Sequence, residues 1–206
     1  MNQKESWDKI ASDWYEFKKN KTTKTELELK KLITNFLKKQ KGKILDLGSG
    51  TGRYLTKIKN GKMYEVDFSK EMIKFAKEKS KKENIPAEFN TANATKLPFK
   101  NNFFDSAIFI ATLHSIKTKK NRIKAVKELF RVLNPSASVL VSVWNKNSKW
   151  FKKRPKEVEI KWKNKYKRYL YLFEKDEIHT LFKNTGFIIK NKIPNNYNII
   201  FTAKKP

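Results

Sequence analysis

Two aspartates and three closely spaced glycines are the residues best suited to hold a small molecule. Asp46 stands two positions before Gly48, and Gly50 and Gly52 follow at alternate positions. Glycines let a backbone approach a ligand that a Cβ atom would push away. Dinucleotide-binding loops space their glycines as G-x-G-x-x-G around a pyrophosphate, whereas this loop reads G-x-G-x-G behind an acid. The carboxylate of Asp46 would repel a pyrophosphate but suits an ammonium group.

A second acid lies where a nucleoside would be held. Asp67 ends the apolar stretch 62–66, at 67 − 46 = 21 residues after Asp46. A carboxylate at the tip of the second strand can accept hydrogen bonds from both hydroxyls of a ribose. An ammonium group and a ribose without a phosphate describe S-adenosylmethionine, which is the predicted ligand.

These acids need particular strands and helices around them. The apolar residues 44–47 predict a buried strand, and residues 54–59 predict a helix whose N-terminus offers free N–H groups to a negative ligand. A capping box formed by Thr25 and Glu28 predicts the start of an earlier helix, and Ser69 caps a later one. Further strands are predicted at 62–66, 87–91, 107–113, 138–144, 187–193 and 197–203, and helices at 4–18, from 25 to before Gly42, and at 70–82, 123–133 and 174–184.

The alternation of strands and helices predicts the fold class. It indicates an α/β fold with a doubly wound, seven-stranded, mostly parallel sheet and one antiparallel strand near the C-terminus. We expect residues 1–206 to form a single domain. Its parts would be N-terminal helices at 1–40, a cofactor-binding core at 43–144, a basic and aromatic connection at 145–173, and a last helix and strand pair at 174–206.

The composition indicates where the protein is located and which kinds of partner it binds. No apolar run is long enough to span a bilayer and the N-terminus lacks a signal-peptide pattern, so we expect a cytoplasmic protein without a membrane contact. The chain has no cysteine, and no metal site is expected in it. The formal net charge of +28 favours a polyanionic partner such as RNA, but a lysine-rich proteome would produce a similar excess.

Four ordered motifs resemble those of class I S-adenosylmethionine-dependent methyltransferases. They are residues 46–52, 65–72, 93–99 and 103–105. The resemblance implies that Asp46 faces the methionine ammonium group and Asp67 the ribose. It also implies that Phe68 and Met72 flank the adenine and that Asn93, where the family usually has Asp, contacts its exocyclic amine. The implied cofactor set is Asp46, Gly48, Ser49, Gly50, Gly52, Arg53, Asp67, Phe68, Met72, Asn93, Ala94 and Ile110. A dehydrogenase or a scaffold without a cofactor fits these motifs less well.

Residues 145–173 combine positive charge with aromatic rings. Basic groups can follow a phosphate backbone while exposed aromatic rings stack on splayed bases, as single-stranded RNA recognition requires. The alternative is a solvated connection whose aromatic rings pack on the domain. The predicted RNA-binding set is Trp14, Lys18, Trp150, Lys152, Lys153, Arg154, Tyr169 and Tyr171.

Looser motifs are similar to those of the tRNA wobble-uridine carboxymethyl methyltransferases. They are residues 7–15, 110–114, 122–123 with 128–133, and 168–173. That family esterifies a 5-carboxymethyl group on the first anticodon base and works with a small zinc-ribbon activator protein. The chain departs from it at 18–21, at Ser115, where the family tends to have a second His, and at 170–171, where it has Tyr-His. The resemblance implies tRNA as partner and leaves the exact uridine substituent open.

The chemistry that this resemblance implies needs few catalytic groups. A carboxylate is ionised at neutral pH, so its methylation needs in-line placement and not a general base. His114 and Arg168 are the candidates for holding the substrate, although His114 could be a capping residue and Arg168 a phosphate contact. The competing function is methyl transfer to a small molecule such as a quinone or lipid precursor, which would favour an apolar lid. A nucleic-acid-binding module that keeps only the scaffold is a third alternative, disfavoured by the intact loop acids.

An activator would have to bring its own zinc, because this chain has no cysteine. Residues 87–91 are expected at the edge of the sheet, where an unpaired strand can receive a strand from a partner.

Overall fold

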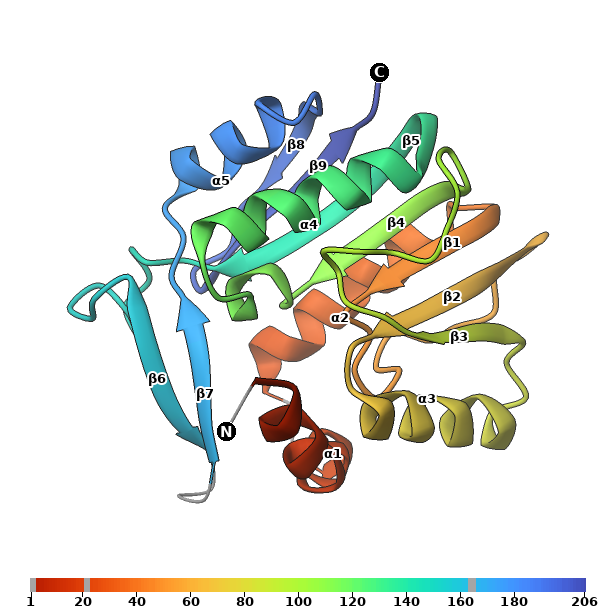
Figure 1. Ribbon diagram of the computed structural model, residues 1–206, viewed down its shortest axis with the longest axis horizontal. Helices are drawn as coiled ribbons and strands as arrows, with labels where there is room; N and C mark the ends of the chain where they lie inside the picture. The colour runs from red at the N-terminus through yellow and green to blue at the C-terminus, as the bar shows by residue number, and fades with distance from the viewer. Residues whose placement is uncertain (1–2, 21–22, 163–165) are drawn as a thin grey trace.

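A seven-stranded sheet lies at the centre of the computed structural model, which describes residues 3–20, 23–162 and 166–206 (Figure 1). The strand order is β3-β2-β1-β4-β5-β9-β8. The strands are β1 (Gly42–Leu47), β2 (Gly61–Asp67), β3 (Ala87–Thr91), β4 (Phe104–Ile110), β5 (Leu133–Trp144), β8 (Ile188–Ile193) and β9 (Asn198–Lys204). β9 runs antiparallel to both of its neighbours, and the pairs from β3 to β5 are parallel. The predicted fold class is confirmed, and β3 is an edge strand as expected.

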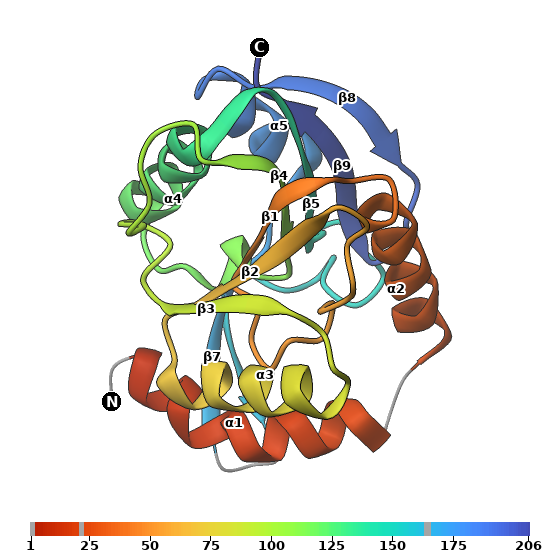
Figure 2. The same cartoon turned by 90° about the vertical axis from the view of Figure 1, so that its right-hand side faces the viewer.

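Helices cover both faces of the sheet (Figure 2). They are α1 (Gln3–Asn20), α2 (Lys24–Leu37), α3 (Lys70–Lys82), α4 (Lys119–Val132) and α5 (Lys175–Lys183), with a 3-10 turn η1 at Leu113–Ser115. On one face α2 buries Ile33 against Ile44 of β1. On the other face Leu129 of α4 packs with Leu45, the next residue of the same strand. Because successive strand residues point to opposite faces, both faces of β1 are buried.

The helix predicted at residues 54–59 is absent, and this prediction was wrong. Residues 51–60 form turns and irregular chain between β1 and β2. Gly48, Gly50 and Gly52 all have positive φ angles, which cannot continue a right-handed helix, and the few residues left are too short for a stable one. α2 already covers this face, and Leu55 of the connection packs into the same cluster. The glycine loop therefore has no helix N-terminus behind it.

Several predicted boundaries shift by a few residues. The capping box of α2 uses Thr23 and Glu26 instead of Thr25 and Glu28, with Glu26 N donating to Thr23 Oγ1 at 3.3 Å. The T-x-x-E spacing occurs twice, and the upstream copy forms the cap because it extends the helix further. β4 and β5 likewise begin before the residues 107 and 138 that were expected.

A hairpin that was not predicted lies within the connection 145–173. β6 (Glu157–Trp162) and β7 (Tyr166–Tyr171) form a separate antiparallel sheet. β7 contacts α1 and η1, so the hairpin stands beside the N-terminal helix (Figure 1). The alternation of polar residues with Val158 and Ile160 was the signal for this strand pair.

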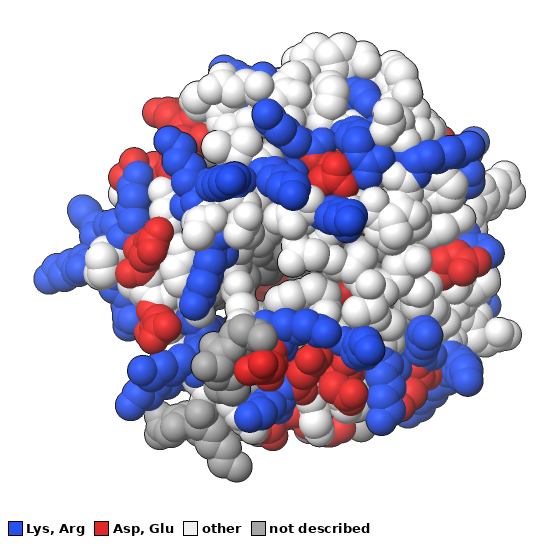
Figure 3. Space-filling view, in the orientation of Figure 1, with Lys and Arg blue, Asp and Glu red and all other residues white. Residues whose placement is uncertain are grey.

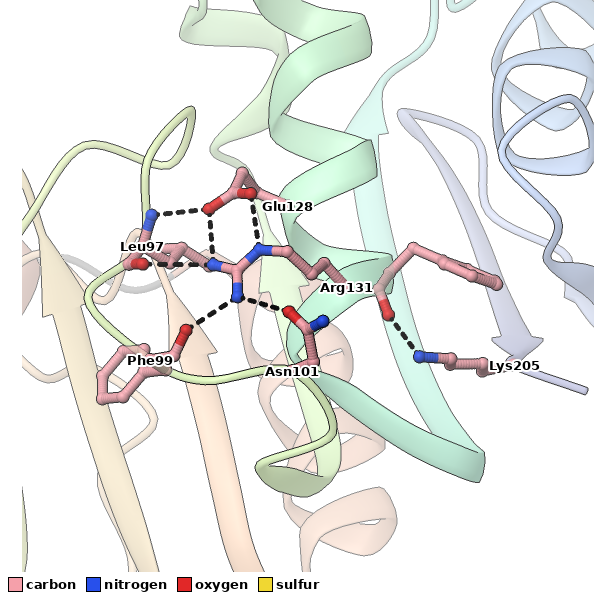
Figure 4. A network of polar contacts seen from close by, with 7 residues as sticks. Leu97, Phe99, Asn101, Glu128, Arg131 and Lys205 are labelled. Carbon is pink, nitrogen blue, oxygen red and sulfur yellow. Dashed lines mark hydrogen bonds and ion pairs between the residues drawn. The ribbon is translucent and has the colours of Figure 1, made fainter.

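The connection between β3 and β4 is fastened to α4 by one arginine (Figure 4). Arg131 forms a bidentate ion pair with Glu128, with Nε–Oε1 and Nη2–Oε2 distances of 2.8 Å. It also donates to the carbonyls of Leu97 and Phe99 and to the side chain of Asn101. Glu128 accepts from Leu97 N at 2.7 Å. This network fixes a segment that begins at the candidate site.

Candidate active site

Two adjoining cavities open at the carboxyl ends of β1, β2 and β4, where open α/β sheets bind ligands. Both are lined by Gly48, Asp67, Phe68, Thr112 and Ser115. The first is completed by Gln3, Leu47, Val66, Ala92, Asn93, Ala94, Thr95, Ile116, Lys117 and Asn121. The second is completed by Trp7, Trp14, Ser49, Gly50, Thr51, Arg53, Tyr54, Met72, Ile110 and Ala111. All of the predicted cofactor residues except Asp46 and Gly52 therefore line one site with two ends.

The glycine loop shapes the wall between the two ends. Gly48 has φ +79°, and a Cβ there would lie 2.2 Å from Oγ1 of Thr112. That hydroxyl donates to the Gly48 carbonyl at 3.2 Å, which ties the loop to the end of β4. A Cβ on Gly50 would meet only the sulfur of Met72, at 4.0 Å. The backbone at Gly50 is therefore open to a ligand.

Asp67 holds the centre of the site. Its Oδ2 accepts from Gly50 N at 3.0 Å and its Oδ1 from Ser69 N at 2.9 Å. Burial raises the pKa of Asp67 to about 6, and these backbone N–H groups oppose the rise. The carboxylate is therefore mostly ionised at neutral pH, and each oxygen retains a lone pair for a ribose hydroxyl.

Asn93 lies in the first cavity together with Ala94. Its Oδ1 accepts from both Thr95 N and Thr95 Oγ1, each at 3.0 Å. The carbonyl that was expected to contact an adenine amine is therefore already used within the loop. The cavity still offers the rings and methyl groups of Phe68 and Ala94 to a flat, apolar base.

Asp46 lies beneath the loop instead of facing a cavity. Its side chain is 1% exposed and lines neither cavity. Burial raises the pKa of Asp46 to about 8, with a further rise from Asp67 and an opposing effect of Lys79. An ammonium group could reach it only past Gly48 and Ser49.

The N-terminal helix walls the second cavity. Ser69 Oγ, at the cap of α3, donates to Asp8 Oδ1 at 2.5 Å and so holds α1 against this motif. Trp7 and Trp14 meet edge to face with ring centres 5.6 Å apart, and both line the cavity. The tryptophans at the start of the chain thus belong to the site.

Arg168 lies beside these tryptophans, and its charge acts on His114. The Arg168 guanidinium carbon lies 5.0 Å from the ring centre of Trp14 and 5.7 Å from that of Trp7. His114 is buried, and its Nδ1 accepts from Trp144 N at 3.3 Å. Burial lowers the pKa of His114 to about 3, and the charge of Arg168 adds to the effect. Neither side chain lines either of the two cavities, but Arg168 contacts two tryptophans that line the second one.

Part of the predicted RNA-binding set is open to solvent. Lys152, Lys153 and Arg154 are exposed, and Trp150 is 59% exposed with its ring 4.6 Å from that of Tyr197. Figure 3 shows Lys and Arg side chains around a hollow in this face of the molecule. The side chain of Lys18 lies outside the described residues.

The two tyrosines of this set pack against α4. The Arg122 guanidinium lies 3.6 Å from the ring centre of Tyr171, and Arg122 Nη1 donates to the Tyr169 hydroxyl at 3.2 Å. Tyr171 is 9% exposed. Its ring is therefore used inside the protein and is not an open platform for a base, which corrects the expectation for this residue.

Sequence reasoning picked out His114 in the turn after β4 but missed Thr112 and Ser115. Thr112 and Ser115 line both cavities, and Ala111 adopts φ +54°. Gln3 Nε2 donates to the Ser115 carbonyl, which joins α1 to the same turn. The only signal was position, because residues that follow a parallel strand face the ligand edge.

Two negative findings concern metals and membranes. Across the described ranges, no group of three or more His, Asp or Glu side chains is placed to hold a metal ion. In the same ranges, no helix has the length and apolar character needed to cross a membrane.

The fold and site define a class. Residues 45–141 match the family described as "Methyltransferase domain". A chain from the complex between the Haloferax volcanii Trm112 methyltransferase activator and its methyltransferase partner has the same fold, with a TM-score of 0.77 at 14% identity, and the alignment covers 100% of this chain and 98% of that one. Residues 45–141 therefore match a methyltransferase domain. The chain also shares the fold of solved S-adenosylmethionine-dependent methyltransferases such as one from Methanosarcina mazei, with a TM-score of 0.72 at 22% identity and an alignment that covers 84% of this chain and 96% of that one.

Two similar proteins are named for different substrates. A tRNA (carboxymethyluridine(34)-5-O)-methyltransferase of Arabidopsis thaliana is 39% identical over 101 residues, which are 49% of this chain and 24% of that protein. A ubiquinone/menaquinone biosynthesis C-methyltransferase of Cronobacter sakazakii is 34% identical over 111 residues, 50% of this chain and 43% of that protein. The chain thus spans less than half the length of either relative.

Proposed function

We propose that this protein transfers a methyl group from S-adenosylmethionine to tRNA. The acceptor is the carboxylate of a 5-carboxymethyl-type wobble uridine, and the product is its methyl ester. The observation that carries the proposal is the Arg168 guanidinium, which lies over the rings of Trp7 and Trp14, two residues that line the second cavity. A cation among aromatic rings is suited to a planar base that bears a carboxylate.

The two cavities divide the cofactor between them. The first would take adenine and ribose, since Phe68, Ala94 and the Asp67 carboxylate line it. The second would take the methionine end, where Arg53 offers a cation to its carboxylate. S-adenosylmethionine supplies an electrophilic methyl group on its sulfonium sulfur when bound.

The chain's own residues would orient the acceptor. Arg168 would hold the acceptor carboxylate by a charge-assisted hydrogen bond, and Trp14 would limit the base to one plane. His114 would stay neutral, because burial holds its pKa near 3, and could only donate or accept a hydrogen bond. No proton needs to leave a carboxylate before methylation, so the rate depends on how the acceptor is placed relative to the methyl group.

Positive charge near the site would hold the RNA backbone. Lys152, Lys153 and Arg154 lie on the exposed segment between β5 and β6. The relative from Arabidopsis is named for the same modification, which supports tRNA over other polyanions. The competing proposal of a small-molecule acceptor draws on the C-methyltransferase relative. It is less well supported, because the tryptophans that line the second cavity also contact a cation, Arg168.

A partner strand could add to the free edge of the sheet at β3. A zinc-ribbon activator bound there would be consistent with the fold shared with the protein from the Trm112 complex. Phe89→Pro in β3 should abolish co-purification with such an activator, and Ile188→Pro in the opposite edge strand β8 is the matched control. Equal loss in both variants, or full retention in both, would count against docking at β3.

The function is tested by nucleoside mass spectrometry. Unmodified and carboxymethylated tRNA would be incubated with labelled S-adenosylmethionine, with and without the activator, and digested to nucleosides. The expected result is label only in the methyl ester of the carboxymethyluridine. In a parallel incubation, a cell extract would be added in place of purified tRNA. Label confined to the lipid or small-acid fraction of that extract would instead support the small-molecule function.

A further inference from the structure

Two buried carboxyl groups lie side by side under the glycine loop. Asp46 of β1 and Glu65 of β2 are register partners in the parallel pair, so their side chains leave the sheet on the same face. Asp46 is 1% exposed and Glu65 is 0% exposed. Neither lines either of the two cavities described above, and the mechanism proposed above uses neither of them.

Within the described part of the chain these groups lack the partners that buried acids normally have. Oδ2 of Asp46 and both carboxyl oxygens of Glu65 have no hydrogen-bond donor. The nearest cation is Lys79, whose Nζ donates to the carbonyls of Gly52 at 2.6 Å and Arg53 at 3.4 Å. Its charge acts on the pair only from a distance, and Asp67 adds a third acid nearby.

Two adjacent carboxylates without a counterion cannot both be ionised in a dry site. Burial, followed by the charge of Asp46, raises the pKa of Glu65 well above its ordinary value. Burial and the charge of Asp67 raise the pKa of Asp46 to about 8. Both groups are thus mostly protonated at neutral pH, and we assign Asp46 to the ammonium group because it stands two residues before Gly48 of the loop.

The pair is connected to the second cavity by Ser49. Ser49 lines that cavity, while its hydroxyl is buried and lies near Glu65 without hydrogen-bonding geometry. Gly48 N and Ser49 N both donate to the Val66 carbonyl, at 2.7 and 3.1 Å, so the loop rests directly on β2. A polar path thus leads from the ligand end to the two carboxyl groups.

We propose that Glu65 is a positioning residue for the ammonium group of S-adenosylmethionine. Once the ammonium group is bound, the neutral carboxyl group of Glu65 would donate a hydrogen bond to the Asp46 carboxylate and hold it toward the loop. When the ammonium group binds, the O–H bond of the Asp46 carboxyl breaks and its proton passes to the buffer, while Glu65 keeps its own proton. This rests on the cofactor of the proposed function and not on the methyl acceptor.

Calorimetric titration with S-adenosylhomocysteine, which carries the same ammonium group, tests the proposal without catalysis. Titrations at pH 7 in buffers of different ionisation enthalpy give the number of protons released. The wild-type protein should release about one proton, because a group with a pKa of about 8 is mostly protonated at pH 7. Asp46→Asn should release none.

Two substitutions of Glu65 separate positioning from packing. Glu65→Gln keeps a hydrogen-bond donor and should keep the proton release and an affinity within about threefold of wild type. Glu65→Met keeps the volume without the donor, and its affinity should fall at least tenfold at pH 7 and partly recover at pH 9.

Three outcomes would overturn the proposal. They are a wild-type protein that releases no proton, a Glu65→Met protein that binds like wild type, and a folded Glu65→Gln protein that has lost the proton release. If Glu65→Met does not fold, the proton release of Glu65→Gln can still be compared with that of Asp46→Asn, and this comparison tests the proposal. A protein that passes these tests but leaves tRNA unlabelled would refute the proposed acceptor alone.

Discussion

Asp67 is the residue through which the loop, the cap of α3 and the expected ribose are joined. Asp67→Ala removes an ionised acceptor, and a hydrogen bond to a charged group contributes about 1.5–3 kcal/mol. Cofactor affinity should therefore fall by at least about tenfold, as measured by calorimetry. Asp105→Ala is the matched control, because Asp105 accepts from Lys43 N at the opposite end of the strands. Equal affinities in the two variants would show that Asp67 does not hold the ligand.

The buried carboxyl pair gives the ligand-free protein an unusual dependence on pH. Burial raises the pKa values of Asp46 and Glu65 above the values of about 4 that they take in the unfolded chain. From about pH 4 to pH 8 the folded protein therefore binds more protons than the unfolded chain, and the free energy of unfolding falls as pH rises.

Glu65→Gln removes one of these groups and isolates its effect. The free energy of unfolding of this variant, relative to wild type, should increase between pH 5.5 and pH 8 in urea titrations. The exposed Asp105→Asn variant controls for the loss of a carboxylate elsewhere. A Glu65→Gln difference that is constant with pH would contradict the raised pKa of Glu65.

At the scale of the elements, the connection between β3 and β4 is held to α4 by Arg131, and this attachment should affect both stability and cofactor binding. Arg131→Ala removes an ion pair and hydrogen bonds to the 97–101 segment. The Arg131 side chain is 31% exposed, so solvent weakens these interactions. We expect a loss of about 1–2 kcal/mol in the free energy of unfolding, after allowing for solvent screening. Cofactor affinity should also fall a few-fold, because the same connection begins at Asn93.

Urea unfolding and calorimetry measure both effects of Arg131→Ala. Arg154→Ala, at an exposed arginine, is the control and should leave the free energy of unfolding unchanged. A loss of stability without any change in cofactor affinity would mean that the network does not order the first cavity.

The elements also show what could be read from the sequence. The spacing of Asp46, the glycines and Asp67 predicted a site at the carboxyl ends of two strands, and Gly48, Gly50 and Asp67 do line a cavity there, whereas Asp46 is buried beneath the loop. The helix at 54–59 was predicted wrongly, since α2, distant in sequence, covers that face instead. The placement of Tyr171 against Arg122 likewise depends on a tertiary contact between β7 and α4, which composition alone does not reveal.

At the scale of the whole molecule, the net charge of +28 predicts RNA binding that weakens steeply with salt. Replacing Lys152, Lys153 and Arg154 by Ala should make the plot of log association constant against log salt concentration less steep by about 2. Each phosphate contact to single-stranded RNA contributes about 0.7 to this slope, and three contacts would be lost. Filter binding of an anticodon stem-loop at several salt concentrations measures this slope.

The same charge can be removed elsewhere as a control. Replacing Lys31, Lys38 and Lys39, which are exposed within or just after α2, should leave the slope nearly unchanged. Equal reductions in both triple variants would mean that the positive charge acts only through the net charge and not through a defined RNA path.

The central claim, methyl transfer to a carboxylate on tRNA, is tested most directly by the stability of the product to alkali. Purified protein, carboxymethylated tRNA and methyl-labelled S-adenosylmethionine would be incubated with activator, and the tRNA then treated with mild base. A methyl ester should release its label as methanol and return the nucleoside to the carboxymethyl form. Label that stays on the base or ribose through the same treatment would contradict the account.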